Sequence, residues 1–439
     1  MLFTLRARLA TLATSAAAAI AVLPSAAPAQ TRGSTSAATS QSKNTATGDI
    51  PAPPRFIVTP RLFSSGVRRS VVEQSAPTIA WRDGKTRISF DAAYLEISSR
   101  VQVRFTEELP DDRTTLPGTE GAGEGRGSFR IRRAKFKLEG WMLQPWLTFE
   151  TQVNYPAVAG SNAGALLEDA AFDIDFTHGE GRFRVHVGQF KPPYGAQEMT
   201  SSGSQMFVDR ALVSNSFFRG REIGVAAWGV TPDNRLEWRV GMFNGNGQTR
   251  TANDNDQFQY NARLMWQPTG RVPLHQRGWI SGPLYSESDF ESAEAPLYAF
   301  GINVERQNNF NATTGNDLKW TAFSVDGIYK FRGLFANGMF ALAQRTPEVG
   351  ASFDAAGGFV QVGQLFGGRR YEVAFRYGQF DPSDVVDRNV TREARGAFSY
   401  YYARHVLKWQ NDVGRVEVQS GLEPPARTWE LRSQLQFVF

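Results

Sequence analysis

The chain contains no cysteine among its 439 residues, which excludes a disulfide framework, thiolate metal sites and a cysteine nucleophile. After its first 30 residues it also lacks any stretch near the roughly 18 consecutive apolar residues that a membrane-spanning helix requires. Its mean hydropathy is negative. A helical membrane protein is therefore excluded. A membrane β-barrel is not, because only every second residue of a barrel strand is apolar.

Recognisable catalytic arrangements are missing as well. The four histidines, His178, His186, His275 and His405, lie in no His-Glu-x-x-His pattern, and no Gly-x-Ser-x-Gly elbow is present. We expect no enzyme activity, no metal and no cofactor. The net charge of +5 is a small excess of 48 basic over 43 acidic residues. It indicates no particular ligand, and no nucleic-acid partner is expected.

The N-terminal residues 1–29 have the pattern of a cleaved signal peptide. Arg6 and Arg8 precede an apolar stretch, and Ala27-Pro28-Ala29 is a small-x-small cleavage site. The alternative is a membrane-anchoring helix, but this stretch is rich in alanine and short for one. We expect export, with cleavage after Ala29.

Residues 30–83 are expected to form an N-terminal arm. The first part, up to Gly48, is Ser, Thr, Ala, Gly and Asn with almost no large apolar residue, a composition typical of disorder. The second part is proline-rich and predicts an extended segment. The remaining residues, 84–439, are expected to form a single barrel domain.

From there the sequence alternates apolar and polar residues in runs of about ten, separated by Gly, Asn, Asp or Pro. Phe183, Val185 and Val187, for example, alternate with Arg182, Arg184 and His186, which is the two-residue period of a strand with one apolar face. The predicted strands lie near residues 95–105, 129–140, 147–155, 167–177, 183–187, 221–231, 235–244, 257–267, 295–306, 319–330, 334–345, 356–366, 369–380, 396–410, 412–422 and 427–439. An even number near 16 predicts an all-β, transmembrane antiparallel barrel.

Connections and chain ends favour the same fold. Tight junctions at 179–181, 233–234 and 331–333 alternate with long segments at 107–127, 191–220, 267–294 and 381–395, as periplasmic turns alternate with outer loops. The final strand ends on Phe439 and is similar to the signal that hands barrels to the outer-membrane insertion machinery. Tryptophans near strand ends are expected in the interfacial girdles: Trp141, Trp146, Trp228, Trp238, Trp266, Trp320, Trp409 and Trp429.

Cationic side chains are predicted to line the lumen. In the strand 129–140 the apolar phase slips at Arg132-Arg133, and a β-bulge there would turn both guanidinium groups inward. The alternative is that these arginines only neutralise wall carboxylates such as Glu139, Asp169, Asp173 or Asp175. A track of further arginines opposite the apolar faces would guide anions: Arg100, Arg104, Arg182, Arg184, Arg239, Arg263, Arg376 and Arg432.

The segment 191–220 has no strand period and is interpreted as a loop folded into the lumen. It follows Val187-Gly-Gln-Phe-Lys-Pro-Pro-Tyr-Gly195 and contains Thr200-Ser201-Ser202 and Asp209-Arg210, ahead of Gly220-Arg-Glu-Ile-Gly-Val225. Together with Arg132-Arg133-Ala134, these blocks resemble the phosphate-selective porin O and P family. The resemblance implies a 16-stranded homotrimeric barrel with a constriction loop. It also implies an anion-binding constriction that contains Arg132, Arg133, Ser201, Ser202 and Arg210.

The expected function is an outer-membrane porin for passive diffusion of small anions in a Gram-negative-type cell, with phosphate as a possible solute. One departure from the family weakens the phosphate assignment, because Glu198 stands where phosphate-specific members have lysine, and a carboxylate repels anions. The alternatives are a general porin and a non-conducting barrel that binds anions at the surface. An outer-membrane hydrolase and a secreted β-sandwich are disfavoured by the missing catalytic patterns and by the polar second face.

Overall fold

The computed structural model describes residues 76–439 apart from 111–125, 156–165, 219, 250–251, 254, 270–278, 280–281, 292–293 and 312–315. The signal peptide predicted at 1–29 and most of the arm predicted at 30–83 therefore lie outside the described residues. All described residues belong to one compact unit, Val72–Phe439. No helix in this part of the chain is both long enough and apolar enough to cross a membrane.

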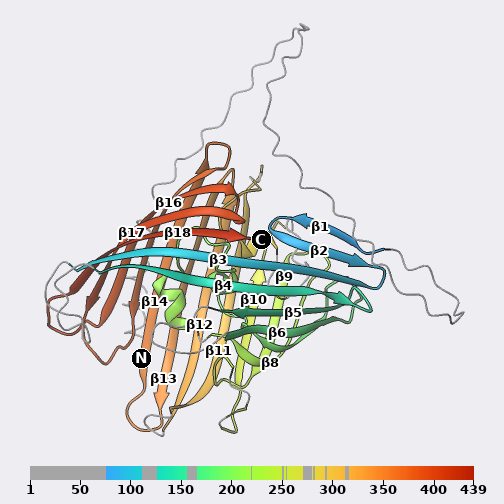
Figure 1. The fold of residues 1–439 in the computed structure, drawn as a ribbon. Coiled ribbons are helices and arrows are strands. Elements are labelled where there is room, and N and C mark those ends of the chain that lie inside the picture. The colour runs from blue at the N-terminus through green and yellow to red at the C-terminus, as the bar shows by residue number, and fades with distance from the viewer. Residues whose placement is uncertain are drawn as a thin grey trace, which may run out of the picture. The chain divides into compact units, whose positions relative to one another are not determined.

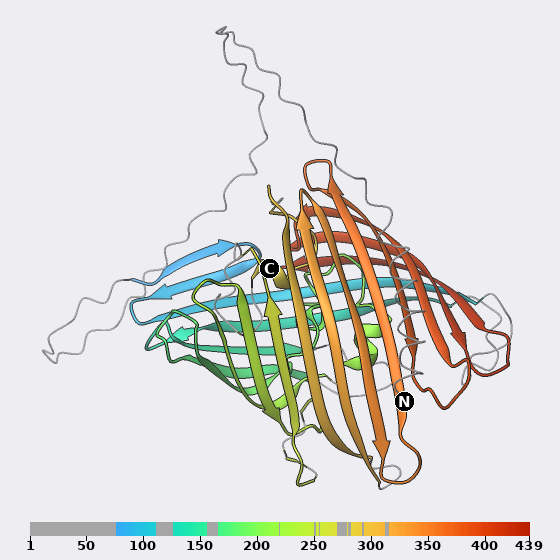
Figure 2. The ribbon, with the colours of Figure 1, turned by 180° about the vertical axis from the view of Figure 1, so that it is seen from behind.

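Sixteen antiparallel strands, β3 to β18, close into a barrel, and the ring is completed where β18 pairs with β3 (Figures 1 and 2). This confirms the predicted fold class. The strands of the ring are β3 (Ala93–Pro110), β4 (Arg126–Met142), β5 (Leu147–Asn154), β6 (Leu166–Asp175), β7 (Arg184–Phe190), β8 (Glu222–Val230), β9 (Leu236–Phe243), β10 (Gln259–Trp266), β11 (Leu297–Asn311), β12 (Asn316–Phe331), β13 (Leu334–Pro347), β14 (Phe353–Phe366), β15 (Tyr371–Asp381), β16 (Val390–Ala403), β17 (Leu407–Gln419) and β18 (Ala426–Val438).

The two-residue period gives the wall two chemically different faces. Val240, Leu264 and Ile302 on neighbouring strands are about half exposed and point outward, where apolar groups face lipid. Arg239 directly precedes Val240 in β9, and Arg263 directly precedes Leu264 in β10. Both arginines are buried on the inside of the barrel. A barrel also leaves no free sheet edge within the ring, so the backbone groups of its strands pair with neighbours.

Tracing the strands assigns each connection to one end of the barrel. One end carries the junctions at 143–146, 176–183, 231–235, 332–333, 367–370 and 404–406 and is called here the turn end; the other is called the loop end. The connection between β10 and β11, residues 267–296, lies at the turn end. Its prediction as an outer loop is wrong, because β10 is the eighth strand of the ring and every even-numbered ring strand ends on that side.

One strand boundary also differs from the sequence prediction. The ranges 396–410 and 412–422 were expected to be two strands, but the chain reverses direction after β16 ends at Ala403, and β17 begins at Leu407. Arg404 supports this turn with a positive φ of 46°. The outward apolar residues change phase there, from Phe398 and Tyr402 before the turn to Trp409 and Val413 after it.

Two further strands lie outside the ring. β1 (Thr78–Arg82) and β2 (Lys85–Phe90) form a hairpin, and β2 pairs with the first residues of β3, from Thr86 opposite Ile97 to Phe90 opposite Ala93. β18 occupies the same edge of β3 further along, up to Arg100. At the hairpin turn Gly84 has φ +72°, and a Cβ there would lie 2.7 Å from the carbonyl oxygen of Val438. The hairpin turn therefore sits directly against the end of β18.

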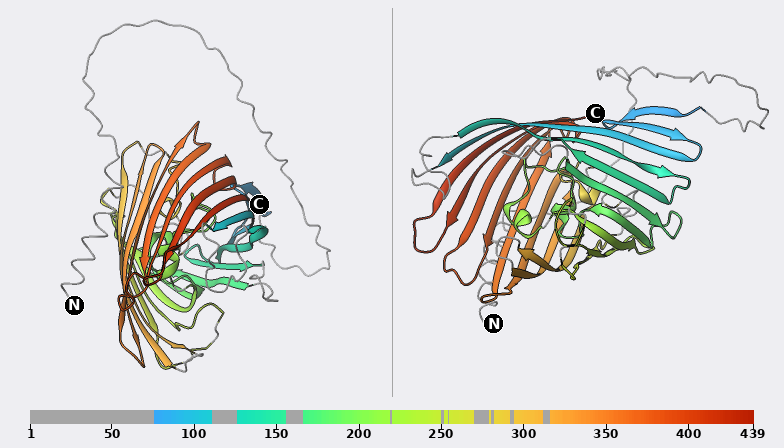
Figure 3. Two further views of the ribbon diagram at one scale, coloured as in Figure 1. Left: turned by 90° about the vertical axis from the view of Figure 1, so that its left-hand side faces the viewer. Right: turned by 60° about the horizontal axis from the view of Figure 1, so that its bottom comes forward.

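Two segments fold into the barrel from opposite ends. The loop 191–221, with α2 (Ala196–Met199) and α3 (Leu212–Phe217), enters from the loop end and lies within the ring of strands (Figure 3). Part of the connection between β10 and β11, with the short helix η1 (Pro283–Tyr285), enters from the turn end. Glu287 joins them, because its carboxylate accepts hydrogen bonds from the Gln197 side chain and from the Met206 backbone N–H.

The two inward segments build an apolar core inside the barrel. Phe190, Met199, Phe207 and Trp279 are almost fully buried in one cluster, together with residues of β8 to β10. Trp228 and Trp320, predicted to lie in the interfacial girdles, are only 1% exposed and belong to this interior. The prediction is wrong for these two, because both stand in the inward phase of their strands, where the loops cover them.

Candidate functional site

The lumen retains two adjoining cavities along the wall formed by β3 to β7. The larger, about 880 Å³, opens at the turn end and is called the vestibule. The smaller, about 220 Å³, lies further along and is called the inner cavity. The two cavities adjoin and together are called here the passage, because six residues line both: Arg100, Lys135, Lys137, Glu150, Gln152 and Ser201.

The inner cavity carries a strong excess of positive charge. Its lining contains three carboxylates, Glu150, Glu168 and Asp169. Eight cationic side chains face them: Arg100, Arg132, Arg133, Lys135, Lys137, Lys191, Arg210 and Arg221. Asp209 and Glu198 stand just behind the lining, and the cations exceed the carboxylates even when these two are counted. A cleft with low-dielectric walls focuses such a field and concentrates small anions.

The predicted bulge is present on β4. Gln102 of β3 pairs with Arg133 and the next residue, Val103, pairs with Ile131, so Arg132 is the extra residue. The bulge restores the apolar phase on the lipid side, and it brings both arginines inward at one height. Arg133 donates to the Gln102 side chain at 2.9 Å, and both Arg132 and Arg133 line the inner cavity.

The partner of these arginines is Asp209 on the inward loop, not a carboxylate of the wall. Its oxygens lie 2.5 Å from Arg104, 3.4 Å from Arg133 and 3.7 Å from Arg132. Burial alone would raise the pKa of the Asp209 carboxyl, yet Arg104 and Arg133 hold this pKa well below its usual range. Three cations thus share one carboxylate, which leaves this height of the lumen positive.

Arg100 of the barrel wall has serine hydroxyls, not a carboxylate, as its side-chain partners. Its guanidinium donates to the hydroxyls of Ser201 at 3.0 Å and Ser202 at 3.2 Å, and among the described residues no carboxylate lies within ion-pair distance of it. The charge of Arg100 is therefore not neutralised by direct contact. Two hydroxyls and a fork of N–H donors around an open space suit an oxyanion.

Gly203 provides the space for Arg100, because a Cβ at this position would lie 2.0 Å from Nη1 of Arg100. We expect Gly203→Ala to displace the guanidinium and break both serine hydrogen bonds, each worth about 1 kcal/mol, and so to lower anion preference about threefold. Reversal potentials under a salt gradient measure this. Arg100→Gln should act similarly and the double variant should add little; full additivity in this cycle would contradict the mechanism.

Arg210, predicted at the constriction, is partly neutralised. Glu198 lies 3.1 Å from the Arg210 guanidinium, is almost fully buried, and accepts a hydrogen bond from Ser214 at 2.9 Å. It does not line the inner cavity. Glu198 thus reduces the positive field by pairing with Arg210, not by facing a solute in the passage.

The other arginines of the predicted track are dispersed and paired. Arg182 lies in the exposed junction between β6 and β7, next to Glu180. Arg184 pairs with Asp173, Arg239 with Glu237, Arg263 with Asp326, Arg376 with Glu393, and Arg432 with Asp412. Of the predicted residues, the structure brings Arg100, Arg132, Arg133, Ser201, Ser202 and Arg210 together around the inner cavity, with Arg104 behind them.

Sequence reasoning did not assign four of the cations that line the inner cavity. Lys135 and Lys137 follow the bulge in the inward phase of β4, so the same alternation could have identified them. Lys191 and Arg221 stand at the two ends of the inward loop and were noted only as motif letters. Arg221 bridges Glu168 and Asp169, at 3.2 Å and 2.8 Å, and so anchors that end of the loop to β6.

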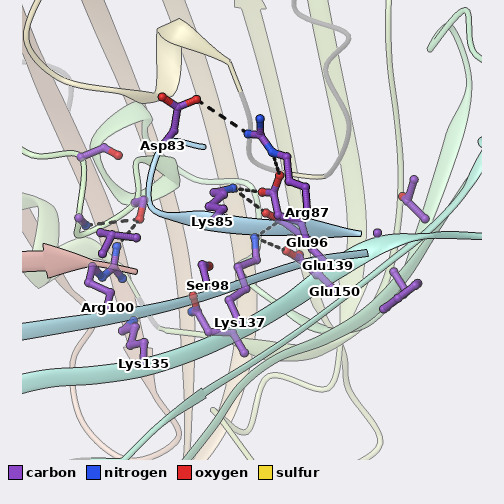
Figure 4. Close-up of a pocket in the computed structure, with 18 of the residues that line it drawn as sticks. Asp83, Lys85, Arg87, Glu96, Ser98, Arg100, Lys135, Lys137, Glu139 and Glu150 are labelled. Atoms are coloured by element: carbon purple, nitrogen blue, oxygen red, sulfur yellow. Dashed lines mark hydrogen bonds and ion pairs between the residues drawn. The ribbon is translucent and has the colours of Figure 1, made fainter. Parts of the chain in front are cut away.

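The vestibule differs from the inner cavity in its charge balance. Its lining includes Arg100, Lys135, Lys137, Glu96, Glu139 and Glu150 of the wall, and the hairpin adds Asp83, Lys85 and Arg87 (Figure 4). Asp173 of the wall lines it as well. Five cations therefore stand against five carboxylates. Within the described residues, no group of three or more His, Asp or Glu side chains could hold a metal ion.

The family model described as phosphate-selective porin O and P matches residues 106–439. A protein of Aquifex aeolicus (strain VF5) named only as uncharacterized is 24% identical over 282 residues, which cover 58% of this chain and 64% of that protein. The chain thus spans less than two thirds of the length of this relative.

Two solved structures have a similar fold. The anion-selective porin from Comamonas acidovorans has a TM-score of 0.55 at 10% identity, covering 79% of this chain and all of the porin. The outer membrane channel DcaP of Acinetobacter baumannii has a TM-score of 0.56 at 11% identity, covering 80% of this chain and 99% of the channel.

Proposed function

The chain belongs to the phosphate-selective porin O and P family, and we propose that it is an outer-membrane porin that passes small anions by passive diffusion. The passage consists of the vestibule and the inner cavity. The observation that carries the proposal is the excess of cations over carboxylates around the inner cavity. The family and the barrel point to a channel, not to an enzyme.

Arg100 and the bulge arginines supply the contacts for a permeating anion. Arg100 is positioned by hydroxyls, and Arg132 and Arg133 share one carboxylate with Arg104. An anion that enters can therefore exchange part of its hydration for N–H and O–H donors without displacing a tight ion pair. Binding that is favourable but weak is what conduction requires.

Phosphate is the solute that the donor set suits best, and a general anion pore is the second candidate. Guanidinium forks and paired hydroxyls match the several oxygens of a phosphate. The pairing of Glu198 with Arg210 favours the second candidate, because it removes one cation from the donor set. The family resemblance further supports a homotrimer. The pattern of residues 1–29 supports export by a cleaved signal peptide, and the last strand ending in Phe439 supports delivery by the barrel-insertion machinery.

Planar-bilayer recordings of the refolded protein under a salt gradient test the proposal. We expect single channels whose reversal potential has the sign of anion preference, because the field of the inner cavity attracts anions and repels cations. Phosphate added to chloride should reduce the current if the donor set binds it. Anion currents that phosphate does not block would establish the general anion pore, and the absence of channels would favour a surface binding protein.

A further inference from the structure

The hairpin β1–β2 contributes to the passage although it lies outside the ring. Its outward residues, among them Ile79, Trp81 and Ile88, continue the apolar face of β3, and Ile88 is paired with Leu95. Its inward residues Lys85 and Arg87 point into the vestibule (Figure 4). The hairpin is thus an additional piece of wall with an apolar outside and a basic inside.

The basic side of the hairpin neutralises carboxylates of the barrel wall. Lys85 contacts Glu96 and lies 2.9 Å from Glu139, while Arg87 lies 2.8 Å from Glu96. Within the described part of the chain, both cations that pair with Glu96 come from the hairpin. Glu139 has a second partner, Lys137 of its own strand, at 2.6 Å.

Without the hairpin, the strands of the ring alone would give the vestibule, which is the turn-end mouth of the barrel, a different charge. Without the hairpin, the charged lining consists of three cations and four carboxylates, and two of those carboxylates, Glu96 and Glu139, would lose contacts. Glu139 and Glu150 share the cation Lys137. A net negative mouth would attract cations and repel anions before they reach Arg100.

We infer that Lys85 and Arg87 are specificity-determining residues of the passage, which keep the turn-end mouth neutral so that anions reach the inner cavity. The inference rests on the proposed function, since it takes the vestibule and inner cavity as the ion path. The residues act through the field they place in the vestibule. Their effect must therefore depend on ionic strength, because the Debye length falls from about 10 Å at 0.1 M salt to about 3 Å at 1 M.

The test is the reversal potential of Lys85→Gln/Arg87→Gln compared with the unmodified chain. We expect the anion-to-cation permeability ratio to fall about threefold at 0.05 M salt, and the difference to shrink strongly at 1 M. The matched control is Arg82→Gln/Arg182→Gln. These two exposed arginines also pair with carboxylates at the turn end, but they do not line either cavity.

A four-residue variant separates charge from a merely structural role of the hairpin. Adding Glu96→Gln and Glu139→Gln to the first variant returns the vestibule to balance and should restore the original permeability ratio. If the ratio is not restored, or if the first variant is unchanged at low salt, the inference is overturned. The proposed function is judged separately, by the sign of the reversal potential of the unmodified chain, whereas the inference is judged by the shift between variants.

Discussion

Replacing Arg132 and Arg133 together with glutamine is expected to lower the anion-to-cation permeability ratio about tenfold. A unit charge about 6 Å from an ion in a wet pore of effective dielectric constant near 60 contributes about 1 kcal/mol, before screening. The double variant removes two such charges and leaves Asp209 paired with Arg104 alone. Reversal potentials in a salt gradient give the ratio directly.

The barrel should remain folded in this variant. Removing the two guanidinium groups uncovers no apolar surface, and Asp209 keeps its shortest ion pair. The matched control is Arg126→Gln/Arg130→Gln, which removes two exposed arginines from the same strand, outside the lining of the inner cavity. A folded double variant with unchanged selectivity would show that the bulge arginines do not act on permeating ions.

Replacing Glu287 with alanine should produce channels that fluctuate to a higher conductance. The Glu287 carboxylate accepts hydrogen bonds from Gln361 at 2.8 Å, Met206 N–H at 2.8 Å and Gln197 at 3.1 Å. Leaving three buried donors unpaired costs about 1–3 kcal/mol each. Two of these donors, Gln197 and Met206, belong to the other inward segment, and Gln361 belongs to β14. The cost therefore falls largely on the contact between the two inward segments, so states in which they separate become populated. Single-channel recordings measure the conductance and the lifetime of these separated states.

The control is Glu291→Ala in the same segment. Its carboxylate is exposed and lies 4.0 Å from Arg404, a weak surface pair. Glu287→Gln should be intermediate, because an amide retains only one acceptor oxygen. Equal conductance and noise in all three variants would mean that Glu287 does not hold the two segments together.

The ring could be predicted from the sequence because it depends on a local period. The phase slip at Arg132 identified the bulge, since one extra residue in a strand changes the face of every later side chain. A count of strand direction would also have placed 267–296 at the turn end. The reversal at Arg404 was missed, although the outward apolar residues change phase between Tyr402 and Trp409.

The pairing inside the lumen could not be predicted, because it depends on register and on loops. Arg263 and Asp326 lie on strands two apart and meet over Gly301 of the strand between them, where a Cβ would lie 2.6 Å from Asp326 and 2.7 Å from Arg263. Asp209 was noted beside Arg210 in a motif, but nothing in the alternation shows that it lies opposite Arg104 and Arg133. Segments that fold into the lumen without a strand period have no sequence pattern that predicts where they pack.

The shared edge of β3 has a consequence for how the chain closes into a ring. β2 occupies this edge from Ala93 to Ile97, and β18 pairs from Arg100 onward. A last strand that slid toward the turn end would collide with the hairpin at Gly84, where no space is left beside Val438. The hairpin thus blocks any slide of β18 toward the turn end along the edge of β3, and the pairing of β18 with β3 is fixed on that side by contact with Gly84.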